Sequence, residues 1–262
     1  MNRLKQYLLQ LPVPATWDQL ATPQYVQVAS GPYLYTGTEL RARITWALLG
    51  ISWRTPRRVA AILFGLSPLD RHQLTKLAEP FLEPEGLLHT PLKALSAGRT
   101  TLPCAHADLL NELDTEEWGL ADTLFLRFAK TKDPELLRAM ACVLYAPEGT
   151  TREERLKGKH LPLMASVPKE QLLAMHHQWT AHRLRLKTDA PWVFRSVNEK
   201  TATRRKSGWT DVMLSMAGTK FGPYNEVART KARVFLRELS HQIEEATRLK
   251  NERESAKNRS RR

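Results

Sequence analysis

Cysteine and glycine are scarce in this chain of 262 residues. The two cysteines, Cys104 and Cys142, lie in separate segments, and there are only 12 glycines. Two isolated cysteines without the spacing of metal ligands argue against a disulfide framework and against a zinc site, and are typical of reduced thiols. The low glycine content, beside an ordinary 16 prolines, excludes low-complexity disorder as the general character of the chain.

Long apolar runs are also missing. No run approaches the roughly 20 apolar residues that a transmembrane helix needs. The first eleven residues contain Arg3 and Lys5, but their apolar stretch is interrupted by Gln6 and Gln10 and ends at Pro12. That stretch is too short for a signal peptide. We therefore expect a cytoplasmic protein that does not enter a membrane.

The sequence motifs of catalysis are absent as well. There is no Gly-x-Ser-x-Gly elbow and no glycine-rich phosphate loop. Cys104 is followed so closely by His106 that the pair is too local for a catalytic dyad. His176, His177 and His182 are separated by steps of one, five and six, whereas two ligands on one helix face need steps of three or four. We therefore predict a protein that is not an enzyme, has no cofactor and binds no metal, and whose histidines are partly buried or at the surface.

What the sequence does contain is helical signal. Thr22-Pro23, Thr55-Pro56 and Ser67-Pro68 each combine a capping residue with a proline at the first helical position. The Leu, Ala, Arg, Lys and Glu-rich segments that follow favour helices. The fold class predicted is mainly α, a multi-helix bundle with a long C-terminal amphipathic helix. Residues 81–106 are predicted to be irregular, and residues 33–35 and 192–194 are the two candidates for short strands.

Residues 115–147 are predicted to form a helical hairpin at the buried centre of this bundle. Thr115 is the expected cap of its first helix, and Asp133-Pro134 is expected to begin the second. The second helix is apolar on nearly all sides. Within the first helix, four apolar residues recur at steps of three and four and should share one buried face: Trp118, Ala121, Phe125 and Phe128.

The net charge of +13 is uneven along the sequence. Residues 1–151 contain 15 Lys and Arg and 15 Asp and Glu, whereas residues 152–262 contain 25 against 12. This pattern predicts a neutral helical domain over 1–147, a charged linker or loop over 148–162, a basic helical region over 163–252, and a disordered basic tail over 253–262. A basic region attracts an acidic partner.

Three basic clusters are the candidate partner-binding surface. The last helix is predicted from about Asn225 to about Glu252, and arginines at four-residue steps would share one side of it, where they can bind phosphates or carboxylates. Three tryptophans, Trp179, Trp192 and Trp209, are near the clusters in sequence and could stack on bases. The alternative is that the arginines form solvated helix faces and the tryptophans belong to the core. The clusters are Arg183, Arg185 and Lys187; Arg204, Arg205 and Lys206; and Arg229, Arg233 and Arg237.

Several sequence blocks, taken together, resemble a group of phage and prophage proteins found among tail-morphogenesis genes. They span most of the chain and carry no catalytic motif. The blocks are residues 14–20 (PATWDQL), 22–24 (TPQ), 121–125 (ADTLF), 141–147 (ACVLYAP), 208–209 (GW), 216–218 (MAG) and 221–222 (FG).

The resemblance implies a non-enzymatic helical accessory protein of virion assembly. Its expected role is that of a tail-assembly chaperone, which coats a hydrophobic helical partner such as a tape-measure protein, in the cytoplasm of the host if the chain is phage-encoded. A long amphipathic terminal helix suits that role, since it can offer its apolar stripe to another helix. The alternative is a nucleic-acid-binding accessory protein that uses the basic C-terminal half, although no helix-turn-helix, zinc-finger or RNP motif is present.

Overall fold

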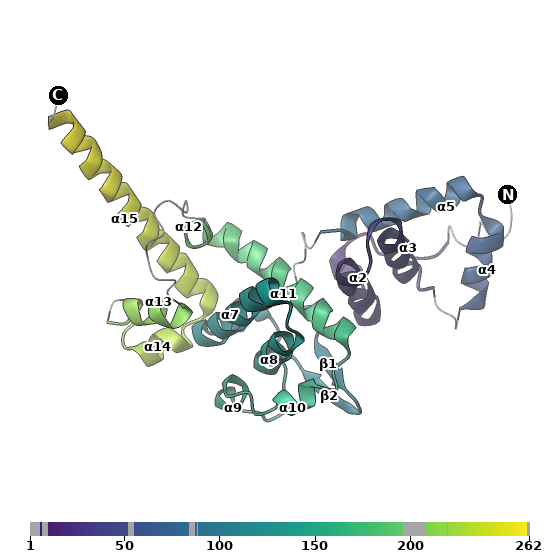
Figure 1. The fold of residues 1–262 in the computed structure, drawn as a ribbon, viewed down its shortest axis with the longest axis horizontal. Coiled ribbons are helices and arrows are strands. Elements are labelled where there is room, and N and C mark those ends of the chain that lie inside the picture. The colour runs from purple at the N-terminus through teal and green to yellow at the C-terminus, as the bar shows by residue number, and fades with distance from the viewer. Residues whose placement is uncertain are drawn as a thin grey trace. The chain divides into compact units, whose positions relative to one another are not determined.

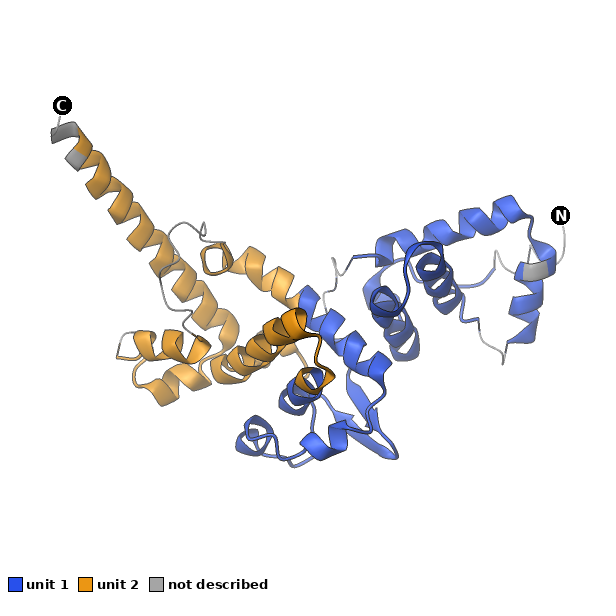
Figure 2. Ribbon diagram, viewed as in Figure 1, with its two compact units in different colours: residues 1–105, 137–181 blue, residues 106–136, 182–262 orange. Residues whose placement is uncertain are grey.

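The computed structural model describes residues 6, 10–51, 55–83, 87, 89–195, 208–218 and 220–260. The fold is mainly α, as predicted. The chain divides into two compact units, each built from two separate stretches of sequence (Figure 2). Unit 1 contains residues 1–105 and 137–181, and unit 2 contains residues 106–136 and 182–262. The structure therefore divides the chain differently from the predicted boundaries at residues 147 and 162.

Unit 1 combines short helices with one β-hairpin (Figure 1). Helix α8 begins just before the unit, which it joins at Leu137, and α11 leaves it after Ala181. Its elements are the 3₁₀ helices η1 (Trp17–Gln19) and η2 (Thr75–Phe81), the helices α2 (Thr22–Leu34), α3 (Gly37–Leu48), α4 (Pro56–Gly65), α5 (Pro68–Leu74), α8 (Pro134–Leu144), α9 (Arg152–Leu156), α10 (Leu161–Met164) and α11 (Lys169–Asp189), and the strands β1 (Ala94–Ala97) and β2 (Thr100–Pro103).

The hairpin of β1 and β2 was missed by the prediction of an irregular segment over residues 81–106. The strands are antiparallel, with Ala97 opposite Thr100 across the turn and the buried Leu95 opposite the buried Leu102. Gly98 takes a positive φ of 62° in the turn, a conformation in which glycine carries no steric penalty. Neither candidate for a short strand forms one, because residues 33–34 end α2 and residues 192–194 lie in a short helix.

An aromatic cluster occupies the core of unit 1. Trp17 lies with its ring centroid 5.2 Å from Phe81, 5.9 Å from Tyr25 and 4.5 Å from His177. All four side chains are buried. The Tyr25 hydroxyl donates to the carbonyl of Ala174 and lies 3.3 Å from Nδ1 of His177. These contacts hold η1, α2 and η2 on the first half of α11.

A buried polar chain in unit 1 joins Tyr145, the residue after α8, to Leu92, which precedes β1. Tyr145 donates from its hydroxyl to the carbonyl of Leu92 at 2.9 Å. Gln178 of α11 accepts from the amide of Leu92 at 3.0 Å and donates to the Tyr145 hydroxyl at 3.4 Å. The two side chains are at most 1% exposed, so their polar atoms need these partners.

Unit 2 is all helical in the residues that the structure describes. Its elements are α6 (Leu109–Glu112), α7 (Thr115–Thr131), the last part of α11 from His182 to Asp189, α12 (Pro191–Phe194), α13 (Trp209–Met216), α14 (Tyr224–Arg229) and α15 (Ala232–Ser260). The predicted hairpin of residues 115–147 is not the centre of one bundle, since α7 belongs to unit 2 and α8 from Leu137 to unit 1.

Helix α7 carries the apolar face that its sequence predicts. Trp118, Ala121, Phe125 and Phe128 are all buried. The predicted N-cap of this helix, Thr115, is wrong by one residue. Asp114 is the N-cap: its carboxylate accepts from the amide of Glu117 at 2.8 Å, and the Glu117 carboxylate accepts from the amide of Asp114 at 3.3 Å. The hydroxyl of Thr115 donates instead to the carbonyl of Thr230.

The last helix is interrupted where a single helix was predicted. Backbone bonds run from the amide of Thr115 to the carbonyl of Thr230, and from the amide of Ala232 to the carbonyl of Leu113, each at 2.9 Å. Because these backbone groups pair across the two segments, they are withdrawn from the helical pattern between α14 and α15. The C-terminal helix therefore starts at Ala232 and not near Asn225.

Helix is also present in two segments that were predicted as a linker or loop (148–162) and as a disordered tail (253–262). The predicted linker contains α9, whose Thr151 and Glu154 cap each other's backbone amides. Helix α15 continues through the predicted disordered tail to Ser260, with ion pairs at i,i+4 such as Lys250–Glu254 at 3.9 Å. Among the described residues, no helix combines the length and the apolar character needed to cross a membrane.

The buried His177 predicts a loss of stability in acid. Burial, with a smaller effect of His176, lowers the pKa of His177 to about 3 from an ordinary 6.5. Between these values the unfolded chain binds a proton that the folded chain does not, so stability falls as the pH falls through that window. The expected slope is about 1.4 kcal/mol per pH unit, measured by urea unfolding at several pH values.

A His177→Leu variant should lose this slope, since Tyr25 keeps its bond to Ala174. His72, an exposed histidine of α5, supplies the control variant His72→Leu. Equal slopes in the two variants would contradict the assignment.

Gly119 predicts a steric limit within unit 2. A Cβ atom at this position would lie 2.9 Å from Cβ of Trp209, closer than side chains tolerate. Helix propensity alone would make Gly119→Ala stabilising by about 1 kcal/mol. We expect instead a loss of about 1–3 kcal/mol in thermal or urea unfolding. Gly208→Ala is the control, because no atom lies within 4 Å of its added Cβ; a stabilised Gly119→Ala protein would refute the close contact.

Candidate functional site

The nine residues predicted as one basic surface do not act alike in the structure. Arg204, Arg205 and Lys206 lie outside the described residues. The other six belong to unit 2. Some are engaged by carboxylates of unit 2, and only part of the set remains available to a partner.

Arg183 is a structural residue of unit 2. Its Nε donates to Oδ1 of Asp122 at 2.8 Å. Its guanidinium carbon also lies 5.9 Å from the ring centroid of Phe125 and 5.2 Å from that of Phe194. A guanidinium that is hydrogen-bonded along its plane and flanked by aromatic rings is held in place by α7 and α12.

Asp122 explains why that arginine is needed. Its side chain is fully buried, and an unpaired carboxylate in such a place is costly. Besides Arg183, the indole Nε1 of Trp209 donates to its Oδ2 at 3.2 Å. Trp209 also packs on Trp118, with ring centroids 4.4 Å apart. Trp209 is half-buried, and its indole is engaged by Asp122 and Trp118 within unit 2.

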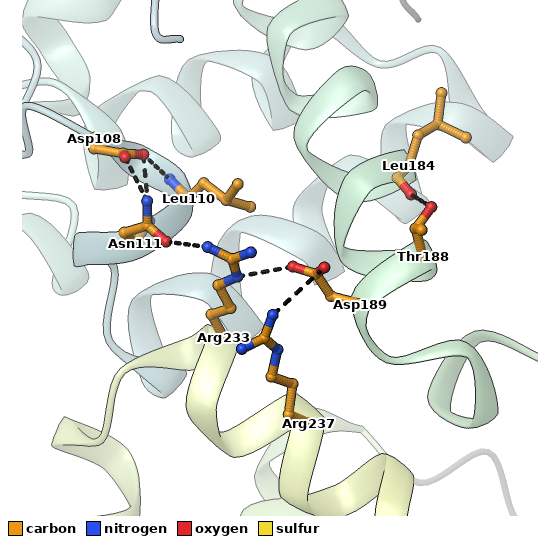
Figure 3. A network of polar contacts seen from close by, with 8 residues as sticks. All are labelled: Asp108, Leu110, Asn111, Leu184, Thr188, Asp189, Arg233 and Arg237. Carbon is orange, nitrogen blue, oxygen red and sulfur yellow. Dashed lines mark hydrogen bonds and ion pairs between the residues drawn. The ribbon is translucent and has the colours of Figure 1, made fainter. Parts of the chain in front are cut away.

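Arg233 and Arg237 are tied to one carboxylate, as Figure 3 shows. Nε of Arg233 donates to Asp189 at 2.7 Å, and Arg237 lies 3.6 Å from the other oxygen of Asp189. Arg233 also donates from a terminal nitrogen to the side-chain oxygen of Asn111 at 2.6 Å. The pair links α15 to the end of α11 and to α6.

The same network continues to Asp108, the N-cap of α6 (Figure 3). Asn111 donates from its side chain to Asp108, and the backbone amides of Leu110 and Asn111 also donate to it. Burial alone would raise the pKa of Asp108, but these hydrogen bonds outweigh it and lower the pKa. This part of the basic surface therefore stabilises the fold.

The predicted row of arginines on one helix is wrong. Arg229 ends α14, whereas Arg233 and Arg237 lie on α15 after the interruption at residues 230 and 231. The four-residue spacing that suggested a continuous row requires unbroken helix, and the backbone pairing with residues 113–115 removes that condition.

Charge is also shared more evenly by the two units than by the two ends of the sequence. Unit 1 contains 17 Lys and Arg against 10 Asp and Glu, and unit 2 contains 23 against 17. The reason is that the acidic stretch 106–136 belongs to the same unit as the basic C-terminal stretch. A carboxylate from the first, Asp122, accepts from an arginine of the second, Arg183.

Two hollows of unit 2 border Trp192 and are the sites that sequence reasoning did not find. The smaller, of about 600 Å³, is lined by Lys187, Pro191, Trp192, Phe194 and Arg195. The larger, of about 1000 Å³, lies between Trp192 and one face of α15. The residues of α15 that line the larger hollow are Glu244, Thr247, Arg248, Asn251, Glu252, Ser255 and Ala256.

Trp192 is held in position by its backbone. Its amide donates to the hydroxyl of Ser240 on α15 at 3.1 Å, and Ser240 is buried. Arg195 stacks on the indole, with its guanidinium carbon 4.8 Å from the ring centroid. The indole itself is half-buried, so it remains open to a partner. The sequence pattern gave α12 no helical period to reveal this arrangement, because the helix has only four residues.

The second half of α15 is the other exposed feature of unit 2 (Figures 1 and 2). Ser240 is 5% exposed, but no side chain from His241 to Ala256 is buried. The apolar stripe predicted for this helix thus passes from buried Ala232 and Phe235 to half-buried Ile243 and exposed Ala246. Leu249 continues the same stripe and is 47% exposed.

The histidines and cysteines form no reactive cluster in the part of the chain that is described. No group of three or more His, Cys, Asp or Glu side chains there could hold a metal ion. His176, His177 and His182 are all buried. Nδ1 of His176 lies 2.7 Å from the Tyr33 hydroxyl, and this hydrogen bond is part of the contact between α2 and α11 in unit 1.

Comparison of the chain with protein-family models, with curated proteins and with solved structures finds no match.

The buried carboxylate of Asp122 predicts a large cost of removal. Asp122→Ala leaves Arg183 and the Trp209 N–H without their acceptor and should lower the free energy of unfolding by roughly 2–4 kcal/mol. Glu254→Ala, which removes an exposed carboxylate paired with Lys250, should cost less than about 1 kcal/mol. Urea unfolding of both variants measures the difference.

A double-mutant cycle isolates the pair. Replacing Asp122 and Arg183 together by leucine should cost less than the sum of the single replacements. Additive costs, or an Asp122→Ala protein as stable as Glu254→Ala, would show that the ion pair does not support unit 2.

Proposed function

We propose that this protein is a non-enzymatic assembly protein that binds a helix of another protein through the second half of α15. The observation that carries the proposal is the stripe of Ile243, Ala246 and Leu249, which continues the buried stripe of α15 into solvent. Apolar residues at steps of three on one helix face are what a partner helix buries in a helix–helix contact.

The face of α15 that lines the larger hollow carries a row of alternating charges. Glu244, Arg248 and Glu252 lie there, with the indole of Trp192 on the other side of the hollow. At 3.6 residues per turn this row is on a different side of the helix from Ile243, Ala246 and Leu249. The apolar stripe is therefore the part of α15 that a partner helix would bury.

Helicity of the exposed half without a partner is supported by its own charges. Arg248–Glu252 and Lys250–Glu254 are ion pairs at i,i+4. Each such pair stabilises an isolated helix by roughly 0.2–0.5 kcal/mol. A binding helix that is already formed avoids part of the entropy cost of ordering it on association.

The specific form of the proposal is a phage tail-assembly chaperone whose partner is a tape-measure protein. It rests on the resemblance of the sequence blocks to tail-morphogenesis proteins, and it fits the helical partner that α15 suits. A tape-measure protein is a long helical chain, and such a chain needs its apolar surface covered before it is enclosed by the tail tube.

The test is coexpression with the tape-measure protein of the genome that encodes this chain. The two should elute together in size-exclusion chromatography. Leu249→Glu should reduce the recovered complex by about tenfold or more, because it places a charge in the apolar stripe. Leu214→Glu is the matched control, since Leu214 lies on α13 of the same unit and is 55% exposed.

Glutamate is a good helix former, so the variant keeps α15 helical. Absence of a complex with the unaltered chain, or equal recovery for Leu249→Glu and Leu214→Glu, would refute the proposal.

A further inference from the structure

The smaller hollow beside Trp192 has a composition of its own. Its five lining residues are two cations, two aromatic side chains and a proline, and none is a carboxylate. The larger hollow, by contrast, contains Glu244 and Glu252 beside Arg248. Within one unit that carries 17 acidic residues, the smaller hollow therefore keeps a local excess of positive charge.

That excess persists because the nearest acidic residue in the sequence is occupied. Asp189 lies two positions after Lys187, but it accepts from Arg233 at 2.7 Å and lies 3.6 Å from Arg237 (Figure 3). Neither Lys187 nor Arg195 makes an ion pair with any residue that the structure describes, and both are exposed. Two cations are thus left for a ligand that carries negative charge.

Both aromatic residues of the hollow make contacts within unit 2. Trp192 is fixed through its backbone amide to Ser240, and Phe194 packs edge-on against Trp118 at 6.3 Å between ring centroids. Arg195 already lies over the Trp192 ring at 4.8 Å, which shows that a planar cation-bearing group is accommodated on an indole face. A flat ring of a ligand could stack on the same aromatic wall without rearranging the helices that carry it.

We propose that this hollow binds single-stranded nucleic acid, with a base stacked at Trp192 and Phe194 and the flanking phosphates held by Lys187 and Arg195. Aromatic platforms beside cations are the general means of binding unpaired bases without sequence preference. An acidic peptide would satisfy the cations but would leave the aromatic wall unused. A duplex is a poor fit, since its bases are already stacked on one another.

This site goes beyond the proposed function and is separable from it, since Leu249 does not line the hollow. Both cations lie at the surface and make no ion pair in the described structure, and the contact that their replacement removes is that of Arg195 with the Trp192 ring. Arg127 and Lys130, exposed residues of α7 in the same unit, provide a control with the same loss of charge.

The experiment is fluorescence anisotropy of a labelled oligothymidylate of about 12 nucleotides, a length within the range bound by compact single-strand sites. The full chain is titrated at about 50 mM and about 200 mM salt, because phosphate contacts release counterions and weaken with salt. Lys187→Gln/Arg195→Gln should weaken binding at least about tenfold and reduce the slope of log affinity against log salt by about 1.4, since each phosphate contact on a single strand contributes about 0.7. Arg127→Gln/Lys130→Gln should bind within about twofold of the unaltered chain if the site is local and the general charge is not responsible.

Two competitors test the stacking. An abasic oligonucleotide of the same length, which keeps the phosphates and lacks bases, should compete at least about tenfold less well, since stacking contributes about 1–3 kcal/mol per base. A duplex of the same length should also compete poorly. Equal competition by the abasic strand or by the duplex would overturn the proposal, as would equal binding by the two double variants or no binding at the lower salt.

Trp192→Leu, with its helicity checked by circular dichroism, should bind the labelled strand like the abasic competitor. Unchanged affinity in a folded Trp192→Leu protein would also overturn the proposal. The Leu249→Glu variant should bind the strand normally, so failure of the helical-partner proposal and failure of this one give different results.

Discussion

Unit 2 is organised around one buried carboxylate, that of Asp122, which needs partners for its negative charge. Asp122 sits on the inner face of α7 with no exposure to solvent, and its two oxygens are satisfied by Arg183 of α11 and Trp209 of α13. A carboxylate placed there without partners would cost more than most single contacts of the fold supply. Helices α7, α11 and α13 are therefore constrained to meet around that side chain. Gly119, one turn earlier on α7, lets Trp209 approach closely enough to reach it.

Much of the fold could be predicted from periodicity and capping, and the errors have a common origin. The apolar face of α7 and the start of α8 at Pro134 depend on local sequence, and both are found in the structure. The hairpin of β1 and β2, the interruption before α15 and the division into two units depend on backbone pairing between residues far apart in sequence. No periodic pattern reports such pairing. The fold class could therefore be predicted, because it depends on local sequence. The domain organisation could not, because it depends on pairing between distant residues.

The candidate site shows the same limit for charge. Counting charges along the sequence suggested a neutral front and a cationic rear, but residues 106–136 bring their carboxylates into the unit that holds the cationic rear. Arg183, Arg233 and Arg237 are consequently committed to Asp122 and Asp189. Arginine spacing in the sequence cannot distinguish a cation that is neutralised within the fold from one that is left over. Lys187 and Arg195 make no ion pair in the described structure. Lys187 belongs to a predicted cluster, and Arg195 does not.

The junction of residues 230–232 has a mechanical consequence. Because backbone bonds to residues 113–115 fix the base of α15, the direction of the helix is set at its root and is not inherited from α14. The stretch from His241 to Ala256, in which no side chain is buried, then extends about 24 Å at 1.5 Å per residue. A force on the free end of α15 would therefore be carried by the backbone hydrogen bonds between residues 113–115 and residues 230–232.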